Sequence, residues 1–269
     1  MKLKKMTAAI LAGVMALGVL AGCSGSGDTP SGNSTQDIST KKQLVMGMDV
    51  SFPPMGFRDE NNEITGFDVE MAKAVCEKLG WEFKAQPIDW TKKEMELENG
   101  SVDVLWNGFS ATEKRREKML LSDPYLENHQ IIVVRKDSEI QSKADLEGKI
   151  VALQKDSSAE PAFQADDISG KIKELVTFSD NVAALNDLKI GRTDAVVVDE
   201  VVANYYTQKD DSFRIVNDSF AAEEYVIGFK KGNEALKEKV MGAFDELVAD
   251  GTASKLSEKW FGKDIIIKK

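Results

Sequence analysis

The sequence predicts an α/β fold made of two similar lobes that share one cleft. Short apolar runs alternate with helical apolar stripes, which is typical of a largely parallel sheet with helices on both faces. The sequence also contains a short internal repeat. Residues 100–106 and 191–197 each form a glycine turn followed by an apolar strand that ends in polar residues. Because the repeat is short, chance similarity is the alternative to a repeated lobe.

The elements follow from the spacing of apolar residues. Helical spacing of Phe67, Met71, Val75 and Leu79 before Gly80 predicts a buried helix face over 67–79. The same reasoning predicts further helices at 93–98, 158–165, 181–189, 201–207 and 234–248, and a final helix before Trp260. Short apolar runs predict strands at 43–48, 82–86, 102–106, 130–134, 149–153, 174–178, 193–198 and 225–229.

The N-terminal segment has the features of a secretory signal. A lysine-rich start is followed by an apolar run from Met6 to Leu20 and by small residues before Cys23. The run is shorter than the roughly 18 residues of a membrane span. Small residues directly before a cysteine resemble the lipobox of bacterial lipoproteins. We therefore expect a signal peptide over 1–22 and a lipid on Cys23; an incidental thiol after an ordinary cleavage site is the alternative.

The polar segment that follows predicts a flexible tether. Residues 24–40 are mainly Ser, Gly, Thr, Asn and Asp, so 23–41 would be a lipidated cysteine and a tether with a reach of roughly 20–25 Å. Loss of residues 1–22 removes three lysines and no acid, which moves the formal charge from −10 to −13. This acidity argues against a nucleic-acid partner.

The chain offers binding groups more clearly than catalytic ones. His129 is its one histidine, and no serine or cysteine elbow accompanies it. No Cys/His spacing suits a metal, and no glycine-rich nucleotide loop is present. Cys76 is expected to be a buried, inert thiol on a helical face. Adjacent acids such as Glu223 and Glu224 are expected to be solvated.

The stretch 107–116 is the best candidate for a binding site. It follows the strand at 102–106 and opens a helix with Thr112 at the N-cap. Arg115 stands where a capping box would have Glu or Gln. Backbone N–H groups, the hydroxyls of Ser110 and Thr112, and this guanidinium would suit a carboxylate or phosphate. A capped surface helix with a solvated arginine is the alternative.

Two other strand ends present polar or aromatic groups. Asp49 and Phe52 follow the first strand, at the carboxyl edge where open α/β sheets bind ligands. Trp90 follows the strand at 82–86 and reads as a hydrophobic plug or, as the alternative, a pocket wall.

Several motifs resemble those of family 3 of the extracellular solute-binding proteins, the polar amino-acid receptors of bacterial ABC importers. They occur in the family's order from about residue 43 to 262. They are 47–54 (G-M-D to P-P), 66–70 (G-F-D-V-E), 108–115, 122–125 (S-D-P-Y), 145–149 (D-L-E-G-K), 191–194, 250–252 and 259–262 (K-W-F-G). The resemblance implies a type II periplasmic-binding-protein-like fold, with two lobes joined by two crossing strands. We expect lobe 1 at 42–128 and 223–269, and lobe 2 at 129–222.

The resemblance also implies roles for residues that would hold a zwitterion. Arg115 would clamp the α-carboxylate, with Ser110, N–H groups near Thr112, and the N–H of Ser158. The carbonyl of Gly108 and the carboxylate of Asp199 would hold the α-ammonium. The ligand side chain would meet two aromatic walls, now including Trp90, and a polar distal end: Phe52, Trp90, Asp49, Asn107 and Gln154.

Two departures from the family weaken this transfer. The second-lobe loop 154–158 reads Q-K-D-S-S where glycines are common, and Asn107 stands where a small residue is common.

The resulting hypothesis is a monomeric, lipid-anchored receptor that needs no cofactor and delivers an amino acid to an ABC permease. Arginine, lysine, glutamine and cystine all stay open as ligands. A dehydratase on the same fold and a sensory or adhesive surface domain are the alternatives.

Overall fold

Two five-stranded sheets and a small three-stranded sheet organise the computed structural model, which describes residues 38–268. The first sheet has the order β5-β1-β6-β13-β7 and the second the order β10-β9-β11-β8-β12. The first comprises β1 (Gln43–Met48), β5 (Glu82–Pro87), β6 (Val104–Leu105), β7 (Leu120–Leu121) and β13 (Gly228–Phe229). The second comprises β8 (Leu126–Arg135), β9 (Ile150–Gln154), β10 (Glu174–Phe178), β11 (Ala195–Asp199) and β12 (Phe213–Tyr225). The third pairs β2 (Ser51–Phe52), β3 (Gly56–Arg58) and β4 (Ile64–Thr65).

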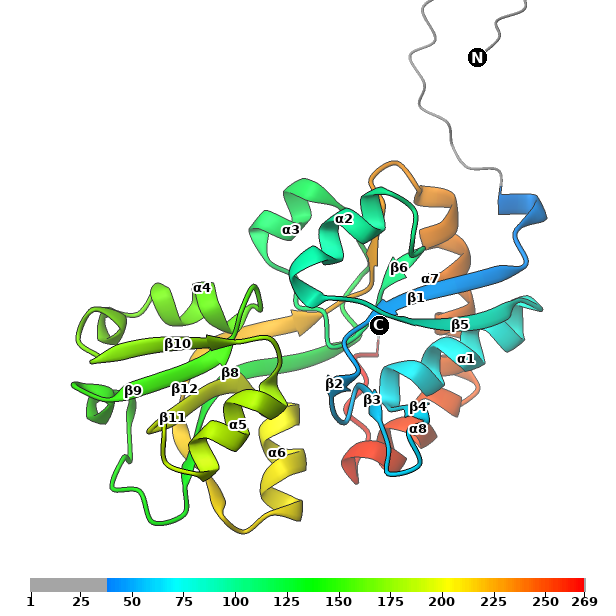
Figure 1. Cartoon of the computed structure of the whole chain (residues 1–269). Helices are drawn as coiled ribbons and strands as arrows, with labels where there is room; N and C mark the ends of the chain where they lie inside the picture. The colour runs from blue at the N-terminus through cyan, green and yellow to red at the C-terminus, as the bar shows by residue number, and fades with distance from the viewer. Residues whose placement is uncertain (1–37, 269) are drawn as a thin grey trace, which may run out of the picture. The chain divides into compact units, whose positions relative to one another are not determined.

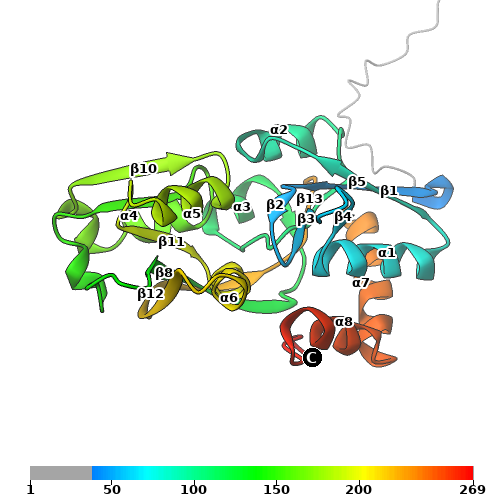
Figure 2. The ribbon, with the colours of Figure 1, turned by 60° about the horizontal axis from the view of Figure 1, so that its bottom comes forward.

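The first sheet and its helices form one lobe. Figure 2 shows β1 and β5 with α2 on one side and α1, α7 and α8 on the other. Because both faces are covered, β1 is buried at four of its six positions, whereas the edge strand β5 keeps exposed residues at Glu82, Lys84 and Pro87. The helical elements of this lobe are η1 (Ile38–Thr40), α1 (Phe67–Leu79), η2 (Trp90–Lys92), α2 (Lys93–Glu98), α3 (Glu113–Lys118), α7 (Glu234–Ala249) and α8 (Thr252–Phe261).

The second sheet and its helices form the other lobe (Figure 1). Its central strand β11 is buried along its whole length, because it pairs with β9 on one side and β8 on the other. The helical elements here are η3 (Lys143–Leu146), α4 (Ala159–Gln164), η4 (Asp167–Gly170), α5 (Asn181–Lys189) and α6 (Glu200–Lys209).

Two long antiparallel strands join the lobes. β8 and β12 pair from Phe213 opposite Arg135 to Tyr225 opposite Leu126. At one end Tyr125 and Tyr225 pack in the first lobe, 6.4 Å apart between ring centroids. At the other end Val134 and Val216 pack in the core of the second lobe. The type II two-lobe architecture with two crossing strands is therefore present, as expected.

Most predicted elements are confirmed, and the main error concerns the second crossing strand. β12 was not predicted, and the strand expected at 225–229 is instead the end of β12 followed by the short β13. β12 is an edge strand of its sheet, so one side lacks a partner strand and its exposed positions tolerate polar residues. Each five-stranded sheet is also mixed rather than purely parallel, because β8, β12, β7 and β13 pair antiparallel.

The predicted helix at 67–79 is α1 itself, and Gly80 ends it in the left-handed conformation (φ 67°). Phe67, Met71 and Val75 are fully buried, which confirms the predicted stripe. Cys76 is a buried free thiol, and burial raises its pKa to about 12. The expected lipid on Cys23, the signal peptide and most of the tether lie outside the described residues.

Candidate functional site

Asp68 in the first turn of α1 positions the loop that follows β6. Its carboxylate is fully buried and accepts hydrogen bonds from the Gly108 N–H (2.7 Å), Trp106 Nε1 (3.1 Å) and the Tyr125 hydroxyl (2.9 Å). Burial raises the pKa of Asp68 to about 7, although the three donors oppose that shift. Three donors from distant segments thus hold the start of the 107–116 stretch in one place. Asp68 was not among the predicted site residues.

Gly108 is required at this point of the loop. It has φ +54°, a conformation that side chains with Cβ rarely adopt. A Cβ here would lie 2.6 Å from Phe52 Cε1 and 3.2 Å from the ring of Tyr225. The predicted site residues Phe52 and Gly108 are therefore in direct contact.

Arg115 is a buried cation, and no carboxylate of the described residues 38–268 pairs with it. Thr112 caps α3 as predicted, with its hydroxyl accepting from the Arg115 N–H at 3.3 Å. The guanidinium donates to the Ser110 carbonyl at 2.7 Å and lies 4.0 Å from the centroid of the Phe109 ring. Burial lowers its pKa to about 10, while the nearby charges of Glu223 and Asp199 oppose this shift. Within residues 38–268 no acid forms an ion pair with it, so it suits an external anion.

Asp199 ends β11 and faces the same interior from the second lobe. Its Oδ1 accepts from Asn128 Nδ2 at 2.8 Å and from the Tyr225 hydroxyl at 2.7 Å. Burial, followed by the charge of Glu223, raises the pKa of Asp199 to about 7. The acid is therefore held in an environment that a cation would stabilise.

The two lobes meet at a pair of serines. Ser158 Oγ lies 3.1 Å from Ser110 Oγ, and both side chains are buried. The structure thus brings the predicted groups Ser110, Arg115, Ser158 and Asp199 to one interior region between the lobes.

A second contact between the lobes involves the residues expected at the distal end of a ligand. Gln154 Nε2 donates to Asp49 Oδ2 at 2.8 Å, and Asn107 Oδ1 accepts from the Asp49 N–H at 2.8 Å. Burial raises the pKa of Asp49. Asp49, Asn107 and Gln154 therefore form one hydrogen-bonded group.

Trp90 lies beside this region in a hydrophobic cluster. Its ring packs edge-on against Phe109, with centroids 5.9 Å apart, and is mostly buried. Lys93 Nζ lies 5.2 Å from the Trp90 ring and donates to the Asp156 carbonyl of the other lobe at 2.9 Å. Burial lowers the pKa of Lys93 to about 8. Lys93 was missed, because a lysine at the start of a helix carries no sign of burial.

The expectation that Glu223 is solvated is wrong. Its carboxylate turns inward and accepts from Asn128 and Gln130, which lie on β8, as well as from both serines. Because β12 was not predicted, its inward positions could not be identified. We call the polar groups gathered here, all buried except the half-buried Glu223, the inter-lobe cluster: Ser110, Arg115, Asn128, Gln130, Ser158, Asp199, Glu223 and Tyr225.

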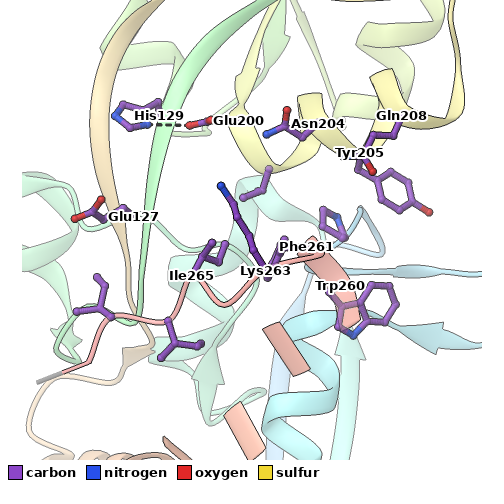
Figure 3. A pocket seen from close by; sticks show the side chains of 14 residues that line it. Glu127, His129, Glu200, Asn204, Tyr205, Gln208, Trp260, Phe261, Lys263 and Ile265 are labelled. Carbon is purple, nitrogen blue, oxygen red and sulfur yellow. Dashed lines mark hydrogen bonds and ion pairs between the residues drawn. The ribbon is translucent and has the colours of Figure 1, made fainter. Parts of the chain in front are cut away.

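A cavity of about 710 Å³ lies on another side of the crossing strands (Figure 3). It is bounded by α6, β8 and the segment after α8, and its lining includes Glu127, His129, Asn204 and Ile265. His129 Nδ1 and Glu200 Oε2 are 2.9 Å apart, but both side chains are nearly half exposed. None of the predicted site residues lines this cavity. Buried charges mark the inter-lobe cluster as the stronger candidate.

Neither a metal site nor a membrane span is found in residues 38–268. No group of three or more His, Cys, Asp or Glu side chains there could hold a metal ion. In the same residues no helix is long and apolar enough to cross a membrane.

Comparisons with known proteins agree with this architecture. The model of the bacterial extracellular solute-binding proteins, family 3, matches residues 44–263. The chain is 31% identical over 268 residues to the L-cystine-binding protein TcyJ of Escherichia coli K12, covering 98% of this chain and 99% of that one. It is 36% identical, with a TM-score of 0.81, to an ABC uptake transporter substrate-binding protein of Streptococcus pneumoniae with bound histidine, covering 84% and 95%. An ancestral amino-acid-binding protein, a precursor of cyclohexadienyl dehydratase, has 33% identity and a TM-score of 0.78, covering 83% and 97%.

Proposed function

We propose that this chain, which belongs to family 3 of the bacterial extracellular solute-binding proteins, captures a free amino acid between its lobes and delivers it to an ABC importer. The observation that carries the proposal is the inter-lobe cluster. It holds a buried guanidinium from the first lobe and a buried carboxylate from the second. An amino acid carries both opposite charges, so one small ligand would neutralise both groups.

Each charged end of the ligand has its own partners in this proposal. Arg115, Ser110 and Ser158 hold the carboxylate, and the N–H groups near Thr112 support it. Asp199 and the carbonyl of Gly108 hold the ammonium. Because these groups come from both lobes, a ligand that contacts all of them favours the closed arrangement over an open one. A permease could then recognise the ligand-bound protein by its closed arrangement.

The remaining predicted residues would select the ligand side chain. Asp49, with Asn107 and Gln154, suits a cationic or amide group, while Phe52 and Trp90 suit a flat or sulphur-containing one. Among the similar proteins, one is an L-cystine-binding protein and another has bound histidine, which supports both a sulphur-containing and a flat, basic side chain. We propose a polar, cationic or cystine-like amino acid as the ligand.

A thermal-shift panel of arginine, lysine, histidine, glutamine and cystine identifies the ligand. An amino acid at about 100 times its dissociation constant adds about 2.7 kcal/mol to the free energy of unfolding. A panel in which every amino acid leaves the transition unchanged would contradict the proposal.

The substitution Arg115→Ala tests the site itself. Removing one partner of a buried charge pair weakens binding by about 2–5 kcal/mol, which calorimetry would record as a loss of about 30-fold or more. Arg116→Ala is the matched control, because Arg116 is the next residue, is half exposed and lies 3.8 Å from Glu224. Near-wild-type affinity in Arg115→Ala would refute this site.

We further propose the cellular setting and the lobe boundaries. A signal peptide over 1–22 and a lipid on Cys23 would anchor a monomeric receptor outside the cytoplasm. Lobe 1 would span 42–128 and 223–269, and lobe 2 would span 129–222. Mass spectrometry of the protein from its native membrane tests the anchor, because a lipidated Cys23 adds the mass of its acyl chains.

The proposal gives the chain no catalytic step. The dehydratase precursor among the similar structures makes an enzyme the rival hypothesis. Turnover of a cyclic amino acid or its precursor by the purified protein would favour that rival.

A further inference from the structure

Glu223 has the hydrogen-bond partners of a bound carboxylate. Its Oε2 accepts from Ser110 Oγ at 2.7 Å, Gln130 Nε2 at 3.0 Å, Ser158 Oγ at 3.1 Å and Asn128 Nδ2 at 3.2 Å. The serines belong to different lobes, and the amides belong to the crossing strand β8. One oxygen atom thus accepts hydrogen bonds from both lobes and from the crossing strand β8 that joins them.

One of these donors is needed elsewhere if an amino acid binds. The Ser110 hydroxyl is assigned to the ligand carboxylate, together with the backbone N–H of Ser158, and Arg115 beside them already feels the charge of Glu223. A hydroxyl has one proton to donate, so it cannot donate to two carboxylates at once. Two carboxylates in one buried region also repel each other.

We propose that Glu223 is an internal competitor of the ligand: its carboxylate holds the hydroxyls of Ser110 and Ser158, links the lobes without an amino acid, and releases the Ser110 hydroxyl when an amino acid binds. This inference rests on the proposed function and adds a residue that sets affinity. It follows that Glu223 lowers affinity for the ligand carboxylate and excludes ligands whose carboxylate binds Arg115 weakly.

The side-chain amides of Asn128 and Gln130 on β8 also favour the replacement of Glu223 by a ligand. Asn128 and Gln130 turn their NH₂ groups toward the acids, and within residues 38–268 the buried oxygens Asn128 Oδ1 and Gln130 Oε1 have no donor. A buried carbonyl oxygen without a donor is unfavourable. A ligand that brings N–H donors and a second carboxylate offers these amides a better set of partners than Glu223 alone.

The experiment compares Glu223→Gln with Glu224→Gln. Glutamine keeps the size of the side chain and removes its charge. Glu224 is the matched control, because it is the next residue of β12, is exposed, and lies 3.8 Å from Arg116. Calorimetric titration with L-arginine and with L-cystine should show about tenfold tighter binding for Glu223→Gln, and an affinity within about twofold of wild type for Glu224→Gln. Unchanged or weaker binding by Glu223→Gln overturns the proposal, and weaker binding would indicate that Glu223 holds the ammonium instead.

A second measurement needs no ligand. Small-angle scattering of the amino-acid-free protein should give a larger radius of gyration for Glu223→Ala than for wild type, while Glu224→Ala stays at the wild-type value. Equal radii for Glu223→Ala and wild type would overturn the link between the lobes. Circular dichroism checks that both variants are folded. If wild type binds no amino acid, the proposed function fails, whereas the scattering comparison still decides the role of Glu223.

Discussion

Gly108→Ala should destabilise the protein much more than a glycine replacement that changes the backbone alone. Gly108 has φ +54°, and an added Cβ would lie 2.6 Å from Phe52 Cε1. The left-handed conformation costs about 1–2 kcal/mol for a residue with Cβ, and overpacking of a filled interior costs about 1–3 kcal/mol more. We therefore expect Gly108→Ala to lower the free energy of unfolding by about 2–5 kcal/mol.

Gly80→Ala is the matched control. Gly80 has φ +67°, and a Cβ there meets nothing within 4 Å, so only the backbone contribution of about 1–2 kcal/mol applies. Urea unfolding followed by circular dichroism gives both values by linear extrapolation. Equal losses in the two variants would refute the reasoning, because they would show that Phe52 yields freely to the added methyl group. Such a result would also show that the contact between Phe52 and Gly108 does not restrict the position of the Phe52 ring.

Three further predictions concern buried acids. Tyr125→Phe removes the hydroxyl that donates to Asp68 and should lower the free energy of unfolding by about 1.5–3 kcal/mol; an unchanged urea midpoint would contradict it. Burial raises the pKa of Asp199 to about 7, whereas a bound ammonium favours the carboxylate, so amino-acid affinity should fall by up to about tenfold per pH unit below 7. Calorimetry at several pH values checks this, and Asp199→Asn should flatten the profile. The stability of the ligand-free protein should change in the opposite sense, because a raised pKa contributes stability that is complete below the ordinary value of 3.8 and is lost as the pH rises through about 7.

Elements with local signals were predicted well. α1 has its predicted ends because an apolar stripe, acids in the first turn and a left-handed glycine all act within one segment. α5 and β10 likewise have their predicted bounds. The second crossing strand was missed, since its charged and apolar residues alternate irregularly and its pairing with β8 shifts register at two points.

In the candidate site, too, the sequence identified some of the residues but not their burial or their partners. Arg115 was named because it opens a helix directly after a strand, and Asp199 because the resemblance to the family implies a role for it, but nothing local to either indicates that it is buried. Glu223 looked like half of a solvated acid pair. Its donors lie 65 to 113 residues away in the chain, so its environment is set only when both lobes and β8 come together.

The sequence by itself therefore determined where the α-helices and the strands β1, β5, β9, β10 and β11 lie, how α3 is capped, and which charged residues are candidates for a ligand. Those properties depend on neighbours within a turn or two of the chain. Only the tertiary structure decided which of the charges are buried and what faces them, because burial and pairing depend on segments that the sequence does not place side by side.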